Sequence, residues 1–336
     1  MTDHATLSRR RAIQTLFCSS AALALNLRAL AQTQVSASGL HFFCIGDFGT
    51  GGADQKKVSA AMQGFIAKHN LKPDALLCLG DNFYSKDKSP AGFTIESPRW
   101  KNEIEDMYPA ASFPGPIYGV LGNHDYHDNA GGQDVQLAYS KKSSTRWKMP
   151  AKWFRLDLGG EKPLVTVLCL DSNLPAVSGG VDKKTRKPRA SLTAAEEQEQ
   201  LAWLENELKK SRAPFTLVVA HHPLYSNGDH GDTKALISQW EGLFQQHKVH
   251  AYLCGHDHDL QHLELEGRYT SHILSGGGGA KTREMEVSHK APFGRQTHGF
   301  THLHISGDAM RFTHYDADGA QLHTFAKKQD GKVVIG

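Results

Sequence analysis

The sequence predicts an α/β fold in which two β-sheets form a sandwich flanked by helices. Through most of the chain, short continuous apolar runs alternate with stretches of helical length, a pattern typical of buried, largely parallel strands joined by crossover helices. The last segments instead alternate apolar and polar residues with turns between them, which is typical of antiparallel strands. The chain has 336 residues, 39% of them hydrophobic, which is enough to bury the core of one large domain.

Residues 1–31 are predicted to be an export signal and not part of the fold. Three arginines at 9–11 precede an apolar stretch at 15–27, and the segment ends in the small-residue pattern Ala29-Leu30-Ala31. The adjacent arginines resemble a twin-arginine signal, which exports proteins that have already folded. The alternative is an amphipathic N-terminal helix, although polar residues interrupt its apolar face. We therefore expect a periplasmic or secreted protein whose residues 32–336 form a single catalytic domain.

The composition argues against two classes of partner. The net charge is only +3, whereas nucleic-acid-binding domains usually carry a strong basic excess in clusters of Lys and Arg. No segment after the signal has the ~18 consecutive apolar residues of a membrane span. We therefore expect neither nucleic acid nor a membrane as a partner once the signal is removed. The cysteines at positions 44, 78, 169 and 254 each lie near the end of an apolar run, which favours buried small hydrophobes over disulfides.

Five apolar runs of strand length end in polar residues. In chain order they are "LHFFCIGD", "DALLCLGD", "GPIYGVLGN", "FTLVVAHH" and "VHAYLCGHDH". None of them alternates apolar and polar residues, so both faces of each strand should be covered. Parallel strands of one sheet bring their carboxyl ends to a common edge, where open α/β sheets bind their ligands. We therefore expect the polar residues after these runs to lie together at the end of a common sheet.

Three stretches are predicted to be the helices of the fold. The first covers residues 53–69 and the third runs from about residue 233 to residue 246. The second, "TAAEEQEQLAWLENELKKS", begins with Thr193 and Glu196 at the spacing of a capping box. Toward the C-terminus, "HGFTHLHISG", "AMRFTHYDADG" and "AQLHTFAKK" alternate apolar and polar residues, and we expect them to form the second, antiparallel sheet.

Two segments are expected to be loops. Residues 174–190 are rich in Gly, Pro and basic residues and have no periodicity, which predicts a mobile exposed loop. The other begins with the glycines at 276–279 and continues through "KTREMEVSHKAPFGRQ", which we expect at the rim of the site.

The polar residues after the five runs have the chemistry of a metal site. Carboxylate oxygen, amide oxygen and imidazole nitrogen form a mixed set of ligands for hard to borderline metals, and seven such groups are too many for one ion. Two ions are therefore expected, and Asp81 is the natural bridge because a carboxylate has two oxygens and lowers the repulsion between neighbouring cations. A single Gly-Asp after a strand is most often a turn, so the metal site is predicted only from the whole set of residues. These are Asp47, Asp81, Asn123, His124, His221, His256 and His258.

Five short blocks resemble, in order, the motif blocks of purple acid phosphatases, which belong to the calcineurin-like metallophosphoesterases. The blocks are "GDFG" from Gly46, "GDNFY" from Gly80, "GNHD" from Gly122, "VVAH" from Val218 and "GHDH" from Gly255. The similarity is greatest to the small, tartrate-resistant type. It implies the metallophosphoesterase fold, a four-layer αββα sandwich of two mixed β-sheets flanked by helices.

The resemblance also implies a ligand set for a dinuclear centre. By analogy, Asp47, Tyr84 and His258 hold Fe(III), while Asn123, His221 and His256 hold a divalent ion, which can be iron, zinc or manganese. Asp81 bridges the two ions.

Tyr84 distinguishes this branch of the superfamily from others. A phenol with a pKa of about 10 ionises at neutral pH only beside a strong Lewis acid such as Fe(III). A 3+ and a 2+ ion together carry five positive charges, and the carboxylates of Asp47 and Asp81 and the phenolate neutralise three of them. The positive charge that is left attracts a phosphate dianion. The alternative is that Tyr84 is a packing residue.

The function implied is that of an acid phosphatase. Two metals lower the pKa of bound water, hold the phosphoryl oxygens and let hydroxide attack phosphorus directly, without a covalent phosphoenzyme. His124 and His230 match the non-ligand histidines of the family and are the expected proton donors to the leaving oxygen. The alternative for His230 is a solvated histidine on a loop. His222 is expected to be packed beside the site.

Other functions remain open. A phosphodiesterase or nucleotidase with the same dinuclear site is the main alternative, and a non-catalytic metal-binding protein is a further one. The small phosphate esters expected as substrates are not identified further. In animal members of the family a loop near the site restrains activity until it is cut. The 174–190 loop falls in a comparable place, but no cysteines flank it, so regulation by cleavage is a hypothesis only.

Overall fold

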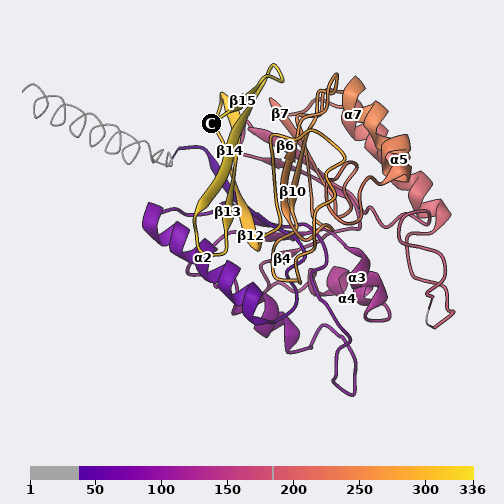
Figure 1. Cartoon of the computed structure of the whole chain (residues 1–336). Helices are drawn as coiled ribbons and strands as arrows, with labels where there is room; N and C mark the ends of the chain where they lie inside the picture. Colours follow the sequence, from indigo (N-terminus) through magenta and orange to yellow (C-terminus); the bar gives the residue numbers. More distant parts are fainter. Residues whose placement is uncertain (1–37, 184) are drawn as a thin grey trace, which may run out of the picture. The chain divides into compact units, whose positions relative to one another are not determined.

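The computed structural model describes residues 38–183 and 185–336 (Figure 1). The predicted export signal lies outside these residues. The first of two mixed sheets has eight strands in the order β15-β14-β13-β12-β1-β2-β3-β4. Strands β1 to β4 are parallel to one another, and β12 to β15 pair antiparallel. The strands are β1 (Leu40–Ile45), β2 (Ala75–Cys78), β3 (Ile117–Gly119), β4 (Trp147–Lys148), β12 (Gly299–Ile305), β13 (Ala309–Asp316), β14 (Gln321–Lys328) and β15 (Val333–Ile335).

The second sheet has seven strands in the order β11-β9-β10-β8-β7-β6-β5. Its centre, β6 to β8 with β10, is parallel, and β5, β9 and β11 pair antiparallel at its two sides. The strands are β5 (Phe154–Leu158), β6 (Val165–Cys169), β7 (Phe215–Val219), β8 (Ala251–Cys254), β9 (Leu260–Leu263), β10 (Ser271–Ser275) and β11 (Phe293–Arg295). The predicted α/β sandwich of two mixed sheets is confirmed.

The predicted distribution of strands between the two sheets is wrong. Of the five apolar runs, three form β1 to β3 in the first sheet and two form β7 and β8 in the second. The C-terminal antiparallel strands do not form a sheet of their own, because β12 pairs with β1. An apolar run shows that both faces of a strand are covered, but it does not specify the neighbouring strand.

The two sheets meet at the ends of their central strands. The backbone N–H of Gly46, just after β1, donates to the carbonyl of Ser275 at the end of β10 (2.8 Å). The Ser275 hydroxyl in turn donates to the carbonyl of Cys44 (3.1 Å). The polar residues that follow strands of both sheets therefore converge at one place.

The predicted helices are present. The first is α2 (Ala53–His69), and the second is α5 (Ala194–Lys209), where Thr193 and Glu196 form the predicted capping box. The third is continuous but changes its winding, from α6 (Lys234–Leu236) through the π-helix η2 (Ile237–Glu241) to α7 (Gly242–Gln246). Shorter helices are α3 (Asn123–His127), α4 (Gly132–Tyr139) and the π-helix η1 (Trp100–Glu105).

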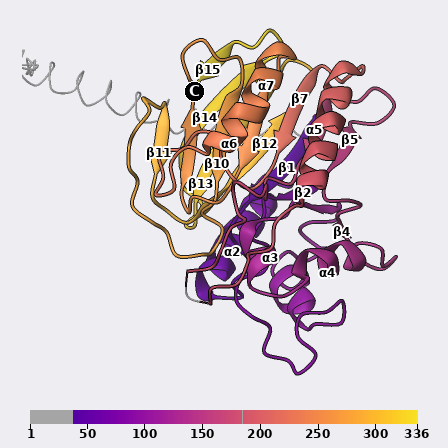
Figure 2. The same cartoon turned by 90° about the vertical axis from the view of Figure 1, so that its right-hand side faces the viewer.

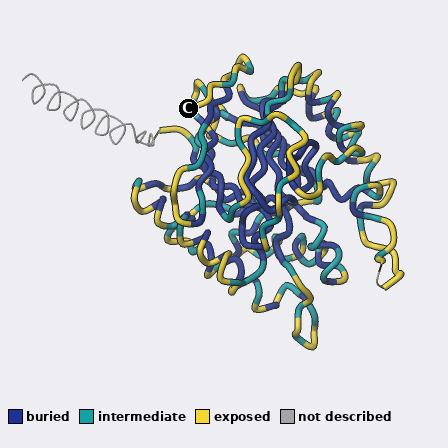
Figure 3. The backbone as a smooth tube through the Cα atoms, viewed as in Figure 1, coloured by how far each residue is buried: buried dark blue, intermediate teal, exposed yellow. Residues whose placement is uncertain are grey.

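Helices cover the outer faces of both sheets. Helix α2 packs on the first sheet through Phe65, whose ring lies 5.8 Å from that of Phe43 in β1 and 6.4 Å from that of Phe300 in β12. Helices α5 and α7 bury Leu204 and Phe244 against the second sheet, and Figure 2 shows both helices in front of its strands. The buried positions concentrate along the strands (Figure 3).

The four cysteines among the described residues are buried and unpaired, as predicted. Within the described ranges, the structure has no helix with both the length and the apolar character needed to span a bilayer.

The two predicted loops differ in character. Residues 174–183 and 185–190 are largely exposed, as expected, but residues 180–183 and 185–189 form the two arms of a hairpin in which Val181 pairs with Pro188. The second predicted loop is a loop over residues 276–292, but the end of the predicted segment forms β11. This loop approaches the candidate site: the Lys281 carbonyl accepts a hydrogen bond from His258 (2.7 Å).

Candidate metal centre

Three of the predicted ligands lie in the left-handed backbone region. Asp47, Asp81 and His256 have φ angles of 57°, 53° and 72°. This conformation costs a non-glycine residue about 1–3 kcal/mol and tends to persist where function requires it. Each residue follows closely after a strand, so the sharp turn of the chain directs its side chain across the strand ends.

Glycines next to the ligands allow this close approach. A Cβ atom added to Gly122 would lie 2.2 Å from Asp81 Oδ1, and one added to Gly255 would lie 2.4 Å from Asp47 Oδ2. Both distances are far below van der Waals contact, so any side chain at either position would displace a carboxylate. The glycines of the "GNHD" and "GHDH" blocks are thus a packing requirement of the site.

A first cluster of donor atoms surrounds the hydroxyl of Tyr84. Tyr84 Oη lies 3.1 Å from Asp47 Oδ1, 2.9 Å from Asp81 Oδ2 and 3.2 Å from His258 Nε2. His258 Nε2 is also 3.4 Å from Asp47 Oδ1. These four residues come from both sheets and from sequence positions more than 200 residues apart.

A second cluster surrounds the imidazole of His221, which follows β7. His221 Nε2 lies 3.2 Å from Asn123 Oδ1, 3.3 Å from His256 Nδ1 and 3.4 Å from Asp81 Oδ1. Asp81 therefore contributes one oxygen to each cluster, Oδ2 to the first and Oδ1 to the second. This is the arrangement that a carboxylate bridging two cations requires.

Backbone carbonyls fix the tautomers of two histidines. His221 Nδ1 donates to the Leu79 carbonyl (2.9 Å), and His258 Nδ1 donates to that of Lys281 (2.7 Å). A carbonyl only accepts, so the proton of each neutral ring is on Nδ1 and the lone pair on Nε2 faces the cluster. Metal-binding histidines are commonly held in this way.

The clusters fit cations because acceptor atoms face one another in them. In the second cluster, the Nε2 lone pair of His221 faces oxygens of Asn123 and Asp81, neither of which can donate to it. Such an arrangement in a buried site is unfavourable unless positive charge lies between the acceptors. In the first cluster, burial and the carboxylates of Asp47 and Asp81 raise the pKa of Tyr84 well above its usual value. The phenol therefore keeps its proton unless a cation displaces it.

His124 lies beside the centre on α3. Its backbone N–H donates to Asp81 Oδ1 (2.9 Å), and its Nδ1 lies 2.9 Å from Asp128 Oδ2. Burial alone would lower the pKa of His124, but Asp128 and Asp81 raise it to about 9. The ring is therefore a charged donor near the clusters in the absence of metal.

His230 also reaches the centre. Its Nδ1 lies 2.7 Å from Asp257 Oδ1, and its ring centroid lies 4.1 Å from that of His256. Arg283, on the second loop, places a guanidinium nitrogen 3.0 Å from His230 Nε2. His230 is 37% exposed in its side chain, so it lies at the open side of the site.

His222 is packed beside the centre, as expected. Its Nδ1 lies 2.8 Å from Ser172 Oγ, and burial lowers its pKa well below the usual value. A ring nitrogen of His222 also lies within 4.8 Å of ligand atoms of His221 and His256.

Two carboxylates that hold the candidate donors were not predicted from the sequence. Asp128 follows His124 by four residues on a helix, and Asp257 lies between two predicted ligands, so both spacings were visible in the sequence. Their partners were not, because the contact between Asp257 and His230 joins residues 27 positions apart.

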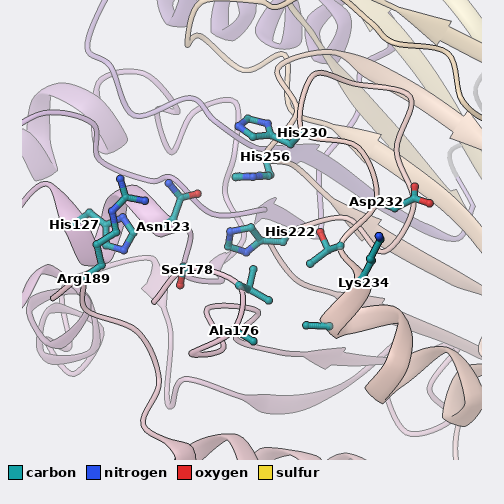
Figure 4. A pocket seen from close by; sticks show the side chains of 13 residues that line it. Asn123, His127, Ala176, Ser178, Arg189, His222, His230, Asp232, Lys234 and His256 are labelled. Carbon is teal, nitrogen blue, oxygen red and sulfur yellow. The ribbon is translucent and has the colours of Figure 1, made fainter. Parts of the chain in front are cut away.

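A cavity of about 530 Å³ opens beside the second cluster. Asn123 and His256 line it together with His222 and His230, and residues of the 174–190 loop and the start of α6 form its other walls (Figure 4). A second cavity of about 570 Å³ adjoins Asn123 and His124 and is bounded by residues 185–190.

Comparison with known proteins identifies relatives along most of the chain. The family model of calcineurin-like phosphoesterases matches residues 40–260. Tartrate-resistant acid phosphatase type 5 of Rattus norvegicus is 30% identical over 313 residues, which cover 88% of this chain and 92% of the relative. The Homo sapiens protein of the same name is 31% identical over 303 residues, covering 84% and 89%. Purple acid phosphatase 7 of Arabidopsis thaliana is 31% identical over 297 residues, covering 84% of each chain.

Solved structures share the fold. A purple acid phosphatase from yellow lupin (Lupinus luteus) seeds superposes with a TM-score of 0.63 at 16% identity, covering 87% of this chain and 54% of that one. The Plasmodium protein GAP50, described as the anchor in the inner membrane complex, has a TM-score of 0.67 at 24% identity, covering 85% and 87%.

Proposed function

Because the chain belongs to the calcineurin-like phosphoesterase family, we propose that it is a metal-dependent acid phosphatase that hydrolyses phosphate monoesters at a dinuclear centre. The observation that carries this proposal is the position of Asp81, whose two carboxylate oxygens belong to two different clusters of donor atoms. The names of the relatives, tartrate-resistant and purple acid phosphatases, support the same reaction.

The proposed ligands of the centre follow the two clusters. Asp47, Tyr84 and His258 would hold Fe(III), which is supported by the oxygen-rich contacts of the phenol. The residues proposed to hold the divalent ion, which is iron, zinc or manganese, are Asn123, His221 and His256. When bound, such a pair of cations neutralises phosphoryl charge and makes water nucleophilic at mildly acidic pH.

His124 is the proposed donor to the leaving group. A water oxygen forms a bond to phosphorus, the phosphorus–oxygen bond to the alcohol breaks, and the alcohol oxygen takes a proton. The His124 Nδ1 is occupied by Asp128, so Nε2 is the nitrogen that is available to the alcohol oxygen. A positioned donor of this kind contributes roughly 10²–10⁴-fold to the rate.

His230 is the second proposed donor, a role that requires Arg283 to move away, because a guanidinium only donates and Nε2 of His230 accepts from it in this structure. Its ring is held against His256 by Asp257, which is 1% exposed and accepts hydrogen bonds from both the backbone and the ring of His230. This contact argues against a free, solvated loop histidine.

The remaining proposals concern the whole chain. We propose that residues 1–31 direct export and that residues 32–336 are one catalytic domain in the periplasm or outside the cell. The small-residue ending at Ala29-Leu30-Ala31 and the basic residues before it support this proposal.

Metal analysis combined with a substrate panel tests the function. Protein loaded with iron and zinc should contain about two metal ions per chain and hydrolyse p-nitrophenyl phosphate, with far slower turnover of bis(p-nitrophenyl) phosphate. Asp81→Asn should lose both ions and the turnover together. Full activity in metal-free protein, or a preference for the diester, would overturn the proposal.

A further inference from the structure

The cavity beside the second cluster has cationic side chains on its walls. Asn123 and His256 line it, so it opens directly onto the residues proposed to hold the divalent ion. Arg189 and Lys234 line the same cavity. In the view of Figure 4, Arg189 lies on one side, near Asn123, and Lys234 lies on the other, with His222 between them. Neither cation is part of the proposed metal centre or of the proton donors.

Backbone contacts hold Arg189 in its place. Its N–H donates to the carbonyl of Gly180 (2.9 Å) across the base of the hairpin. The next residue, Ala190, accepts a hydrogen bond from His127 on α3 through its carbonyl (3.0 Å). The hairpin base is therefore tied both to itself and to the helix that carries Asn123. The guanidinium does not depend on a flexible tether to reach the cavity.

The charge of Arg189 is only partly satisfied. One guanidinium nitrogen lies 3.3 Å from Asp182 Oδ2, and the two side chains are 44% and 31% exposed. An exposed pair at this distance is weak. A guanidinium has five N–H donors, so several remain for an anionic ligand.

The side chain of Lys234 on the opposite wall has no hydrogen bond or ion pair to any of the described residues. The acidic residue in this cavity, Asp232, is engaged elsewhere: its carboxylate lies 2.8 Å from His289 Nε2 and accepts from the backbone N–H of Ser226 (3.1 Å). The cavity therefore offers positive charge beyond what its own acid neutralises.

We propose that this cavity is a subsite for a second anionic group of the substrate, with Arg189 as its main contact and Lys234 as the cation on the opposite wall. The proposal rests on the proposed function, because the scissile phosphate must occupy the metal centre. The substrate class is then a phosphate monoester of a small alcohol that carries a carboxylate or a further phosphate. A monoester with a neutral alcohol leaves both cations without a ligand.

A pair of matched esters tests the subsite by turnover. 3-Phosphoglycerate and glycerol 3-phosphate share a primary-alcohol leaving group and differ in one carboxylate. The wild-type ratio of their kcat/KM values should favour 3-phosphoglycerate. In Arg189→Gln this ratio should fall roughly 10- to 100-fold, the size expected for a lost hydrogen bond between charged groups. Lys183→Gln, which removes one positive charge from the same hairpin but does not line either cavity, should keep the wild-type ratio.

A binding measurement tests the subsite without turnover. 3-Phosphonopropionate and propylphosphonate resist hydrolysis and again differ in one carboxylate. By calorimetry, the wild-type protein loaded with metal should bind 3-phosphonopropionate more tightly, and Arg189→Gln should remove most of that difference. Arg189→Lys should restore part of it, since it returns the charge but not the planar fork.

The outcomes separate the subsite from the function. If Arg189→Gln and Lys234→Gln both keep the wild-type ratios of esters and of phosphonates while glycerol 3-phosphate is hydrolysed, the subsite is overturned and the phosphatase remains. An equal loss for both esters also overturns it, because the residue then acts on the scissile phosphate. If the loaded protein hydrolyses neither these esters nor p-nitrophenyl phosphate, the proposed function itself fails.

Discussion

At the residue scale, one side chain bears on the metal that we propose for the first cluster. Tyr84 is the only phenol among the predicted ligands, and its hydroxyl touches both carboxylates and His258. Burial and these carboxylates oppose its ionisation, so only a strongly acidic cation can take the proton's place. The identity of the first metal therefore depends on one side chain.

The colour of the protein tests this role. Loaded wild-type protein should be purple or pink, because a phenolate bound to Fe(III) gives a charge-transfer band in the visible range. Tyr84→Phe should lose the band and bind less iron, as measured by absorption and metal analysis. A colourless, iron-free preparation with full activity would contradict the assignment of Fe(III).

His124 should affect the rate without affecting metal content. His124→Ala removes the proposed donor but no proposed ligand, so two ions should remain while kcat falls roughly 10²-fold or more. Asp128→Asn, which keeps the ring but weakens its orientation, should give a smaller loss. An unchanged rate in His124→Ala would exclude this residue as the donor, and a loss of metal would instead make it structural.

At the scale of elements, strand ends build the site and helices support it. Helix α5 buries Leu204 and Leu208 against the second sheet, whose strands β7 and β8 end two residues before His221 and His256 respectively. The start of α5 is defined by Thr193, whose hydroxyl accepts from the backbone N–H of Glu196 (3.1 Å).

Loss of this cap should lower the stability of the fold and leave the catalytic rate unchanged. Thr193→Ala leaves a backbone N–H at the helix start without its partner, which costs about 1 kcal/mol. We expect a midpoint of thermal unfolding lower by about 2 °C for a domain of this size, with kcat unchanged. Thr193→Ser keeps the acceptor and should restore the midpoint. A Thr193→Ala protein as stable as the wild type would show that packing, and not the cap, holds the start of α5.

At the scale of the whole molecule, buried histidines limit the acid range. His314 in β13 is 0% exposed, and burial lowers its pKa to about 3. In the unfolded chain the same group has a pKa of about 6.5. Below pH 6.5 the unfolded chain therefore binds a proton that the folded protein does not, and stability falls as the pH drops toward the folded value.

Denaturant unfolding at several pH values tests this effect. Above pH 6.5, His314 should contribute little to the pH dependence of the free energy of unfolding. Between pH 6.5 and 4.5 the free energy of unfolding should decrease by about 1–3 kcal/mol. His314→Gln should show a flatter profile over that window. If the profiles of variant and wild type run parallel, His314 is not a source of the acid sensitivity.

Much of this molecule is predictable from its sequence because the signals are local. The apolar runs, the capping box at Thr193 and the order of the polar blocks each depend on a few neighbouring residues. The left-handed conformation of Asp47 and Asp81 is not predictable in this way, because it follows from contacts with other strand ends. The same holds for the assignment of β1 and β7 to different sheets, which depends on pairing between residues far apart in the chain.

The placement of the centre between two sheets has a consequence for folding. Asp47 and Asp81 follow strands of one sheet, whereas His221 and His258 follow strands of the other. Neither half of the chain can assemble the complete set of donors, so tight uptake of two ions has to await docking of the halves. Two ions bound at the proposed centre would join the halves more firmly than hydrogen bonds alone. Amide protons of β1 and β10 should therefore exchange with deuterium more slowly in loaded protein than in stripped protein.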